Sequence, residues 1–248
     1  MRIIAVSNIK GGVGKTTTAV NLAYLSARGG ARTVLWDLDS QGAASWILQA
    51  EEKRRTTVRQ LLDRKRDLDE IVVDTEFENL HLIPADFSYR KFDAKLAERS
   101  NPTKRLLRMA RPLGEHYDTL FMDCPPGITV LSESVLRAAD ALVVPLLPTP
   151  LSVRMLEQLA DFIQTKDWAD FKLMPFFSMV DRRKSLHHEI IEEVRKRFRQ
   201  VLPTEIPYSS EIERMSLRRA PLNSYAHASE QAQAYEQLWT EIKRRMRR

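Results

Sequence analysis

The sequence predicts an α/β protein in which a doubly wound, mostly parallel β-sheet carries helices on both faces. Short apolar, β-branched segments alternate along the chain with longer segments of helical periodicity. The strand segments are apolar throughout, as expected for strands that are buried on both faces. The 248 residues contain no internal repeat and no low-complexity stretch. We therefore expect a single domain over residues 1–248.

The expected elements follow one another in a regular order. An apolar strand at residues 2–7 leads into a glycine-rich turn and a helix at 16–28, which Gly29 and Gly30 end. Further strands are expected at 32–37, 80–84, 119–123, 141–145 and 173–180. Further helices are expected at 58–63, 103–113, 130–138, 152–165, 187–199 and 229–246. The charged stretch 51–55 and the segment 62–74 are interpreted as surface excursions.

Composition excludes several classes of protein. The lone Cys124 rules out an internal disulfide framework and any metal site built from several cysteines, which favours a reducing, cytoplasmic location. No apolar run approaches the ~20 residues of a transmembrane helix. The net charge of +6 is concentrated in residues 243–248, which carry five basic groups. Such a tail contacts nucleic acid or anionic lipid, or is simply a solvated helix end.

A glycine-rich loop lies between the first strand and the first helix. It consists of Lys10, Gly11, Gly12, Val13, Gly14, Lys15, Thr16 and Thr17. In this context the sequence predicts a phosphate-binding P-loop, in which backbone amides converge on phosphate oxygens at a helix N-terminus. Lys15 is expected to reach the β- and γ-phosphates, Thr16 to ligate Mg²⁺ and Thr17 to hold the α-phosphate. The generic P-loop pattern, G-x-x-x-x-G-K-[ST], has its first glycine at the position that Ile9 occupies here. This loop departs from that pattern, and it adds a second lysine, Lys10.

Carboxylates follow two of the expected strands. Asp123 ends the strand at 119–123 and precedes Pro-Pro-Gly, where it would hold Mg²⁺ through water. Asp37 and Asp39 end the strand at 32–37 and point the same way, so one could organise the metal hydration and the other orient an attacking water. The alternative for Asp123 is a helix cap, and the alternative for Asp39 or Ser40 is a cap on a helix that starts near residue 43.

Together these motifs resemble the ParA/MinD family of deviant Walker A ATPases, a group of P-loop NTPases, and its ParA (Soj-like) branch most closely. The resemblance covers nearly the whole chain. KGGVGKTT matches the deviant P-loop, with Lys10 as its signature lysine, and YDTLFMDCPPG is similar to the Walker B segment that ends at Asp123. DLDSQG resembles the DLDPQG switch, with Ser40 in place of proline. The segments that contain Met179 and Pro207 resemble those that close over the adenine.

The resemblance implies a function. ATP and Mg²⁺ would join two protomers face to face, Lys10 would reach the partner's nucleotide, Asp39 would position water, and hydrolysis would dissolve the homodimer. The ATP dimer would bind DNA without sequence preference, and a ParB-like or cargo-adaptor protein would stimulate hydrolysis. A plasmid, a chromosome or a large protein assembly would thereby be partitioned or positioned by a cytoplasmic, nucleoid-associated protein. An ATP-gated binding switch with slow hydrolysis needs the same residues and stays an alternative.

Candidate DNA contacts are the basic clusters. They comprise Arg218 and Arg219, the tail residues Lys243, Arg244 and Arg245, and the stretches 182–184 and 195–199. The stretch 195–199 follows Glu192 and Glu193, which is also typical of a solvated helix face. A MinD-like membrane helix is the alternative for the tail. The apolar residues of its helix mostly precede the basic ones, which disfavours membrane attachment and favours docking on the core. These apolar residues are Tyr235, Leu238, Trp239, Ile242 and Met246.

Overall fold

The computed structural model describes residues 1–49, 56–63, 65–165 and 171–247, and the stretch 51–55 discussed above lies outside them. Over the described residues, eight strands form one sheet in the order β3-β4-β2-β5-β1-β6-β7-β8. The strands are β1 (Arg2–Val6), β2 (Thr33–Asp37), β3 (Val73–Asp74), β4 (Leu80–Ile83), β5 (Thr119–Asp123), β6 (Ala141–Leu146), β7 (Lys172–Val180) and β8 (Glu205–Pro207). Every neighbouring pair is parallel except β3 and β4. The predicted fold class is confirmed.

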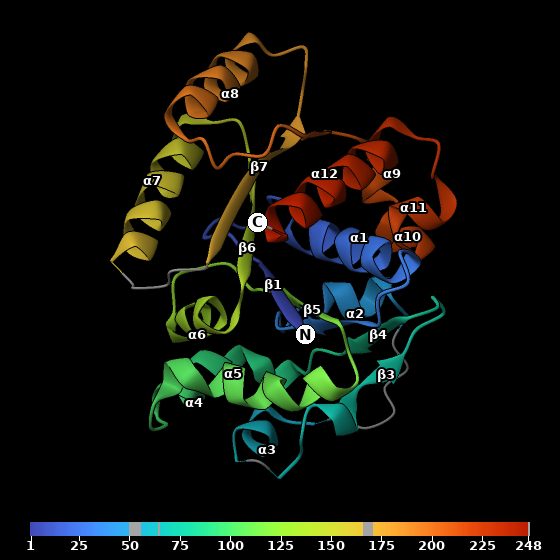
Figure 1. The fold of residues 1–248 in the computed structure, drawn as a ribbon, viewed down its shortest axis with the longest axis vertical. Coiled ribbons are helices and arrows are strands. Elements are labelled where there is room, and N and C mark those ends of the chain that lie inside the picture. The colour runs from blue at the N-terminus through green and yellow to red at the C-terminus, as the bar shows by residue number, and fades with distance from the viewer. Residues whose placement is uncertain (50–55, 64, 166–170, 248) are drawn as a thin grey trace.

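Helices cover both faces of this sheet (Figure 1). One face carries α1 (Lys15–Arg28), α2 (Ala43–Ile47), α9 (Ser210–Glu213), α10 (Met215–Arg218), α11 (Leu222–Tyr225) and α12 (Glu230–Met246). The other carries α3 (Val58–Leu62), α4 (Phe92–Ala97), α5 (Arg105–Ala110), α6 (Val130–Ala138), α7 (Pro150–Gln164) and α8 (Ser185–Arg197). Short 3₁₀ turns occupy Asp69–Ile71, Phe87–Lys91, Pro102–Lys104 and Arg111–Glu115.

The apolar strands separate two hydrophobic clusters. In β1, Ile3 and Ala5 pack with α3–α8, whereas Ile4 and Val6 pack with α1, α2 and α10–α12. Because side chains alternate along a strand, a strand covered on both faces must be apolar at every position. This is the physical reason why the continuous apolar runs identify strands in this chain.

The sheet topology brings the P-loop and the strand-end carboxylates to one edge. β1 lies between β5 and β6, so the chain leaves the sheet in opposite directions on the two sides of β1. Such a switch point forms a crevice at the carboxyl ends of the strands. Val6 and Asp37 are both register partners of Asp123, which places the end of β1 beside both aspartates.

The segment 62–74 is not a surface excursion, and that prediction is wrong. Leu62, Leu68, Ile71 and Val73 are buried, and Val73 begins β3, which pairs antiparallel with β4. The apolar residues follow no single period because the segment passes from a helix end through a 3₁₀ turn into a strand. The strand β8 and the short helices α4 and α9–α11 were also not predicted, whereas α2 begins at Ala43, where the sequence indicated a helix start.

The last helix docks on the core, as its apolar stripe predicts. Tyr235, Leu238 and Ile242 are fully buried, and the Trp239 ring lies 5.8 Å from that of Phe121 in the sheet. Ser229 caps the helix by accepting a hydrogen bond from the Ala232 N–H. Within the described part of the chain, no helix combines the length and apolarity that crossing a membrane requires.

Candidate nucleotide-binding site

The P-loop backbone depends on glycine at two positions. Gly12 and Gly14 have φ values of 70° and 87°, in the left-handed region that side chains rarely adopt. A Cβ at Gly14 would also lie 3.2 Å from the Ser178 Oγ of β7. Gly14 ends the loop as the N-cap of α1, and its carbonyl accepts hydrogen bonds from the Thr18 N–H and hydroxyl. Nothing lies within 4 Å of a Cβ built at Gly11, so the loop faces open space where phosphates would lie.

The two lysines of the loop have different environments. The Lys15 side chain is buried, and its ammonium donates to the Lys10 carbonyl at 3.0 Å. Burial lowers the Lys15 pKa, while Asp123, Cys124 and Asp39 act in the opposite direction. The Lys10 N–H donates to Asn8 Oδ1, and the Asn8 amide donates to the Pro145 carbonyl, which fixes the loop against β6. Across the described residues, the Lys10 ammonium makes no hydrogen bond or ion pair.

Asp123 has the environment of a cation ligand. Its side chain is fully buried, and among the described residues no group reaches either carboxylate oxygen with full hydrogen-bond geometry, although the Thr16 side chain lies near enough to act on its pKa. Burial raises its pKa well above the usual range, and the charge of Asp37 adds to this, while Thr16 and Lys15 oppose it. Buried polar atoms normally have partners, so this pair of oxygens points to a bound group. Hydrated Mg²⁺ beside Thr16 fits these donors.

Asp37 lies next to Asp123 but has partners of its own. One oxygen accepts from the Ser45 N–H and hydroxyl at 2.8 and 2.7 Å, and the other accepts from the Asp39 N–H at 3.2 Å. Burial raises its pKa to about 6 despite these hydrogen bonds. Asp37 therefore fixes the first turn of α2 as well as facing the site. The alternative that Asp39 or Ser40 caps this helix is wrong, because its N-cap is Gly42.

Asp39 lies in the turn between β2 and α2. It is half-buried, and its charge acts on both Lys15 and Asp123. Its carboxylate accepts from the Gln41 N–H at 3.0 Å, and its carbonyl accepts from the Gly42 N–H. The turn thus holds a third carboxylate close enough to act on Lys15 and Asp123.

Met179 and Pro207 lie in one small pocket beside the P-loop. The pocket has a volume of about 40 Å³ and also includes Gly14, Thr17 and Tyr235. Met179 has a φ of 55°, where the pairing of β7 with β8 is irregular. Such strain in a non-glycine residue is typical of binding sites. Sequence reasoning missed Asn8 and Ser45, which lie outside the motifs, and it assigned Tyr235 to the packing of the last helix but not to this pocket.

Comparisons with known proteins agree with this geometry. A family model described as an AAA domain matches residues 1–175. The chromosome partitioning protein ParA of Myxococcus xanthus is 33% identical over 98% of this chain and 88% of its own length. The sporulation initiation inhibitor protein Soj of Bacillus subtilis is 33% identical over 97% of this chain and 98% of its own length. The chain belongs to the ParA/MinD family of P-loop ATPases.

A solved structure supports the same relationship. A crystal structure described as cobyrinic acid a,c-diamide synthase from Mycobacterium smegmatis, with a bound ATP analogue and magnesium, is 27% identical to this ParA-type chain. It superposes with a TM-score of 0.82 over 100% of this chain and 96% of its own. The whole ParA-type fold is therefore shared, including the strands and helices that follow residue 175.

Two basic stretches of this ParA-type chain, 182–184 and 195–199, are largely paired with carboxylates. Arg182 pairs with Glu230 at 2.7 Å, and Arg183 pairs with Asp181 at 2.9 Å. In the stretch 195–199, ion pairs join Arg195 to Glu205, Lys196 to Glu192, and Arg197 to Glu157 and Glu193. These stretches are therefore poor candidates for a surface that attracts phosphates.

Arg218 and Arg219 differ from these clusters, and we call this pair at the end of α10 the basic turn. Within the described ranges, neither has a carboxylate partner. Instead, the Arg218 guanidinium lies 5.1 Å from the centre of the Tyr225 ring, and that of Arg219 lies 4.3 Å from the centre of the Trp46 ring. Stacking on an aromatic ring leaves the positive charge available to an anion.

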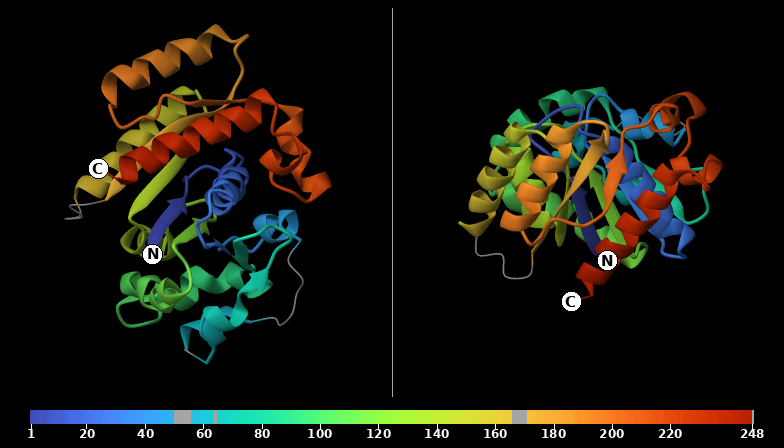
Figure 2. Two further views of the ribbon diagram at one scale, coloured as in Figure 1. Left: turned by 45° about the vertical axis from the view of Figure 1, so that its right-hand side comes forward. Right: turned by 90° about the horizontal axis from the view of Figure 1, so that it is seen from above.

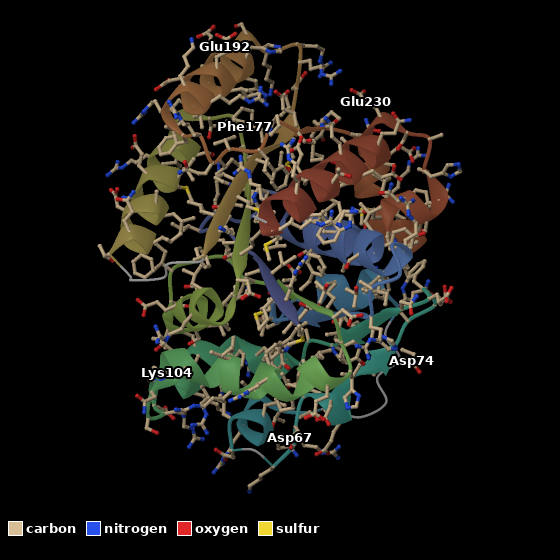
Figure 3. All side chains as sticks on the ribbon, in the orientation of Figure 1. Asp67, Asp74, Lys104, Phe177, Glu192 and Glu230 are labelled. Atoms are coloured by element: carbon tan, nitrogen blue, oxygen red, sulfur yellow. The ribbon has the colours of Figure 1, made fainter. Side chains whose placement is uncertain are left out.

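The C-terminal tail lies away from the basic turn. The tail lies at the C-terminal end of α12, which spans 17 residues, or about 25 Å, whereas the basic turn follows α10, before α12 begins. Figure 2 shows the C-terminus near the N-terminus, and Figure 3 shows Glu230 at the other end of the helix. Arg245 donates to the carbonyls of Gln200, Arg199 and Val201, whereas Lys243 and Arg244 are exposed. Within one protomer the tail does not join the basic turn.

Proposed function

We propose that this chain is a Mg²⁺-dependent ATPase that dimerises with ATP and uses DNA to partition or position a cargo. The observation that carries the nucleotide part is Asp123, a buried carboxylate with two unpartnered oxygens, next to Thr16 and Lys15 at the start of α1. The Mycobacterium smegmatis relative holds an ATP analogue and magnesium. The proposal extends that binding to the P-loop of this chain.

In this proposal, phosphate binding, Mg²⁺ binding and the orientation of water are carried out by different residues of the site. The backbone amides of residues 11–15 hold the phosphates, and Lys15 neutralises charge on them. Thr16 and Asp123 would hold Mg²⁺, with Asp37 beside them, and the ion supplies further charge neutralisation when bound. Asp39 orients a water, whose oxygen bonds to the γ-phosphorus as the bond to the ADP oxygen breaks. The products are ADP and phosphate.

Dimerisation gives Lys10 its role. Its ammonium has no partner in the described part of the chain, although Asn8 fixes its backbone. A cation held at a fixed place without a counter-ion is suited to a phosphate brought by a second protomer. Lys10 would then stabilise the nucleotide of the partner, so that ATP favours the dimer and hydrolysis dissolves it.

The basic turn supplies the DNA contact. Its two arginines lack the carboxylate partners that the stretches 182–184 and 195–199 have, and each guanidinium lies on an aromatic ring. Phosphate contacts of this kind need no base sequence. The relatives named as chromosome partitioning proteins support a partitioning role at the nucleoid, in the cytoplasm, with a ParB-like or cargo-adaptor protein as the stimulating partner.

Fluorescence anisotropy with a labelled duplex of arbitrary sequence tests the DNA part. Binding is expected with ATP and Mg²⁺ and much weaker with ADP. The double substitution Arg218→Glu/Arg219→Glu should weaken binding at least about tenfold, because each dimer loses several phosphate contacts. Arg182→Glu/Arg183→Glu makes the same change of charge in an ion-paired cluster and is the matched control. Equal losses in both variants would contradict the assignment of the basic turn.

A further inference from the structure

Helix α2 connects the nucleotide site directly to the basic turn. At its first turn, Ser45 donates two hydrogen bonds to the Asp37 carboxylate, one from its N–H and one from its hydroxyl. The same hydroxyl accepts from the Ala85 N–H at 2.9 Å. The start of α2 is thus fixed by the aspartate that lies in register with Asp123. Whatever moves Asp37 also moves this helix.

The next residue, Trp46, makes two contacts with Arg219 of the basic turn and one with Ser216 of α10. Its ring lies 4.3 Å from the Arg219 guanidinium, its Nε1 donates to the Ser216 carbonyl at 2.9 Å, and its carbonyl accepts from Arg219 Nε at 3.1 Å. Gln49 adds a hydrogen bond to the Arg219 carbonyl at 3.0 Å. The side chain of Trp46 is nevertheless 55% exposed, so its burial contributes little to the core.

The basic turn needs this support. α10 has only four residues, too few to be stable as a helix on its own. Arg219 follows it with a φ of 51°, in the left-handed region that costs a non-glycine residue energy. The contacts with α2 hold both the backbone and the guanidinium of Arg219. The orientation of this arginine therefore depends on where α2 lies.

We propose that Trp46 is a positioning residue that transmits the state of the nucleotide site, through Asp37, Ser45 and α2, to Arg219. The inference rests on the proposed function, since it assumes that the basic turn binds DNA. When the site holds Mg²⁺ and ATP, Asp37 fixes the first turn of α2 in one position. Trp46 then holds the Arg219 guanidinium in the orientation that binds DNA. DNA bound to Arg219 biases the nucleotide site by the same path in reverse.

This reciprocity provides the test. Linkage requires that the factor by which ATP strengthens DNA binding equals the factor by which DNA strengthens ATP binding. Both factors can be measured on the full chain, by anisotropy with labelled duplex DNA and with a fluorescent ATP analogue that resists hydrolysis. Light scattering reports dimerisation in parallel, so that a loss of the dimer is recognised as such.

Trp46→Ala should lower both factors together, by about five- to thirtyfold, because a cation–π contact and a hydrogen bond are lost. The net charge, the dimer and the affinity for ATP without DNA should stay unchanged. Trp46→Phe keeps a ring under the guanidinium and should restore most of the coupling. Phe87→Ala is the matched control: Phe87 is 69% exposed and lies under Arg90 at 4.2 Å, away from α10. It should leave both factors as in the wild type.

The failures are distinguishable. A wild-type protein that does not bind DNA with ATP overturns the proposed function and the inference with it. If the wild type binds and Trp46→Ala keeps both coupling factors, the inference alone is overturned. If Trp46→Ala and Phe87→Ala reduce DNA binding equally, or if Trp46→Ala loses the dimer, Trp46 is not a positioning residue for Arg219.

Discussion

Replacing Asp37 by asparagine should stabilise the protein when nucleotide and Mg²⁺ are absent. Asp37 is fully buried beside Asp123, and its carboxylate must ionise in that setting at neutral pH. Burial raises its pKa from 3.8 to about 6. The folded protein therefore binds the proton more tightly than the unfolded chain, and ionisation above pH 6 costs stability. Asparagine has a similar shape and carries no charge.

The magnitude follows from the size of the shift. Raising the pKa of Asp37 from 3.8 to about 6 corresponds to about 3 kcal/mol at neutral pH. The asparagine loses about 1 kcal/mol, because its amide nitrogen cannot accept one of the hydrogen bonds that the carboxylate receives. The net gain is about 2 kcal/mol, or about 4–8 °C in Tm for a chain of this length.

Thermal unfolding in EDTA at pH 4.5 and 7.5 measures the effect. The contribution of Asp37 to the free energy of unfolding of the wild type falls as the pH rises from about 4 to about 6. The increase in Tm caused by Asp37→Asn should therefore be largest at pH 7.5 and small at pH 4.5. Asp118 is the control with the opposite sign: Arg32 lowers its pKa to about 2, so Asp118→Asn should not stabilise at pH 7.5. The reasoning would be refuted if Asp37→Asn had a lower Tm than the wild type at pH 7.5, or if its increase in Tm were the same at pH 4.5 and pH 7.5.

Two further predictions concern the nucleotide itself. Lys15→Gln removes the buried ammonium at the loop and should weaken ATP binding by about a hundredfold in isothermal titration calorimetry, since charge-assisted bonds to phosphate are lost; unchanged affinity would contradict its role. Asp39→Ala should bind ATP within a few-fold of the wild type but release phosphate about a hundred times more slowly, leaving the dimer on DNA. Normal turnover of Asp39→Ala would exclude a water-orienting role, and slow turnover of the wild type would favour the ATP-gated switch.

The sequence predicted the parts of the site that are defined locally. Asp37 and Asp123 were found because each ends an apolar strand, and parallel strands end at one edge. Gly14 and Lys15 were found because a helix begins directly after the loop. The second partner of Asp37, Ser45, was missed, because an isolated serine after a turn carries no signal of its own.

What the sequence could not predict depends on contacts between distant segments. It located the basic stretches, but the carboxylates that neutralise them, Glu157, Glu205 and Glu230, lie elsewhere in the chain. The short helices α9–α11 and the three-residue strand β8 are fixed by tertiary packing rather than by their own propensity. Their positions decide which arginines stay unpaired, so the selection of one cluster over the others required the structure.

The contacts of Arg245 change how the basic tail should be studied. This arginine holds the carbonyls of residues 199–201, which join α8 to β8. A truncation of the tail would release that connection as well as remove charge, so a loss of DNA binding after truncation would have two causes. Charge reversal at Lys243 and Arg244, which are exposed, separates the two. Arg245, one of the arginines that raise the isoelectric point, thus stabilises the packing of α12 against the connection between α8 and β8.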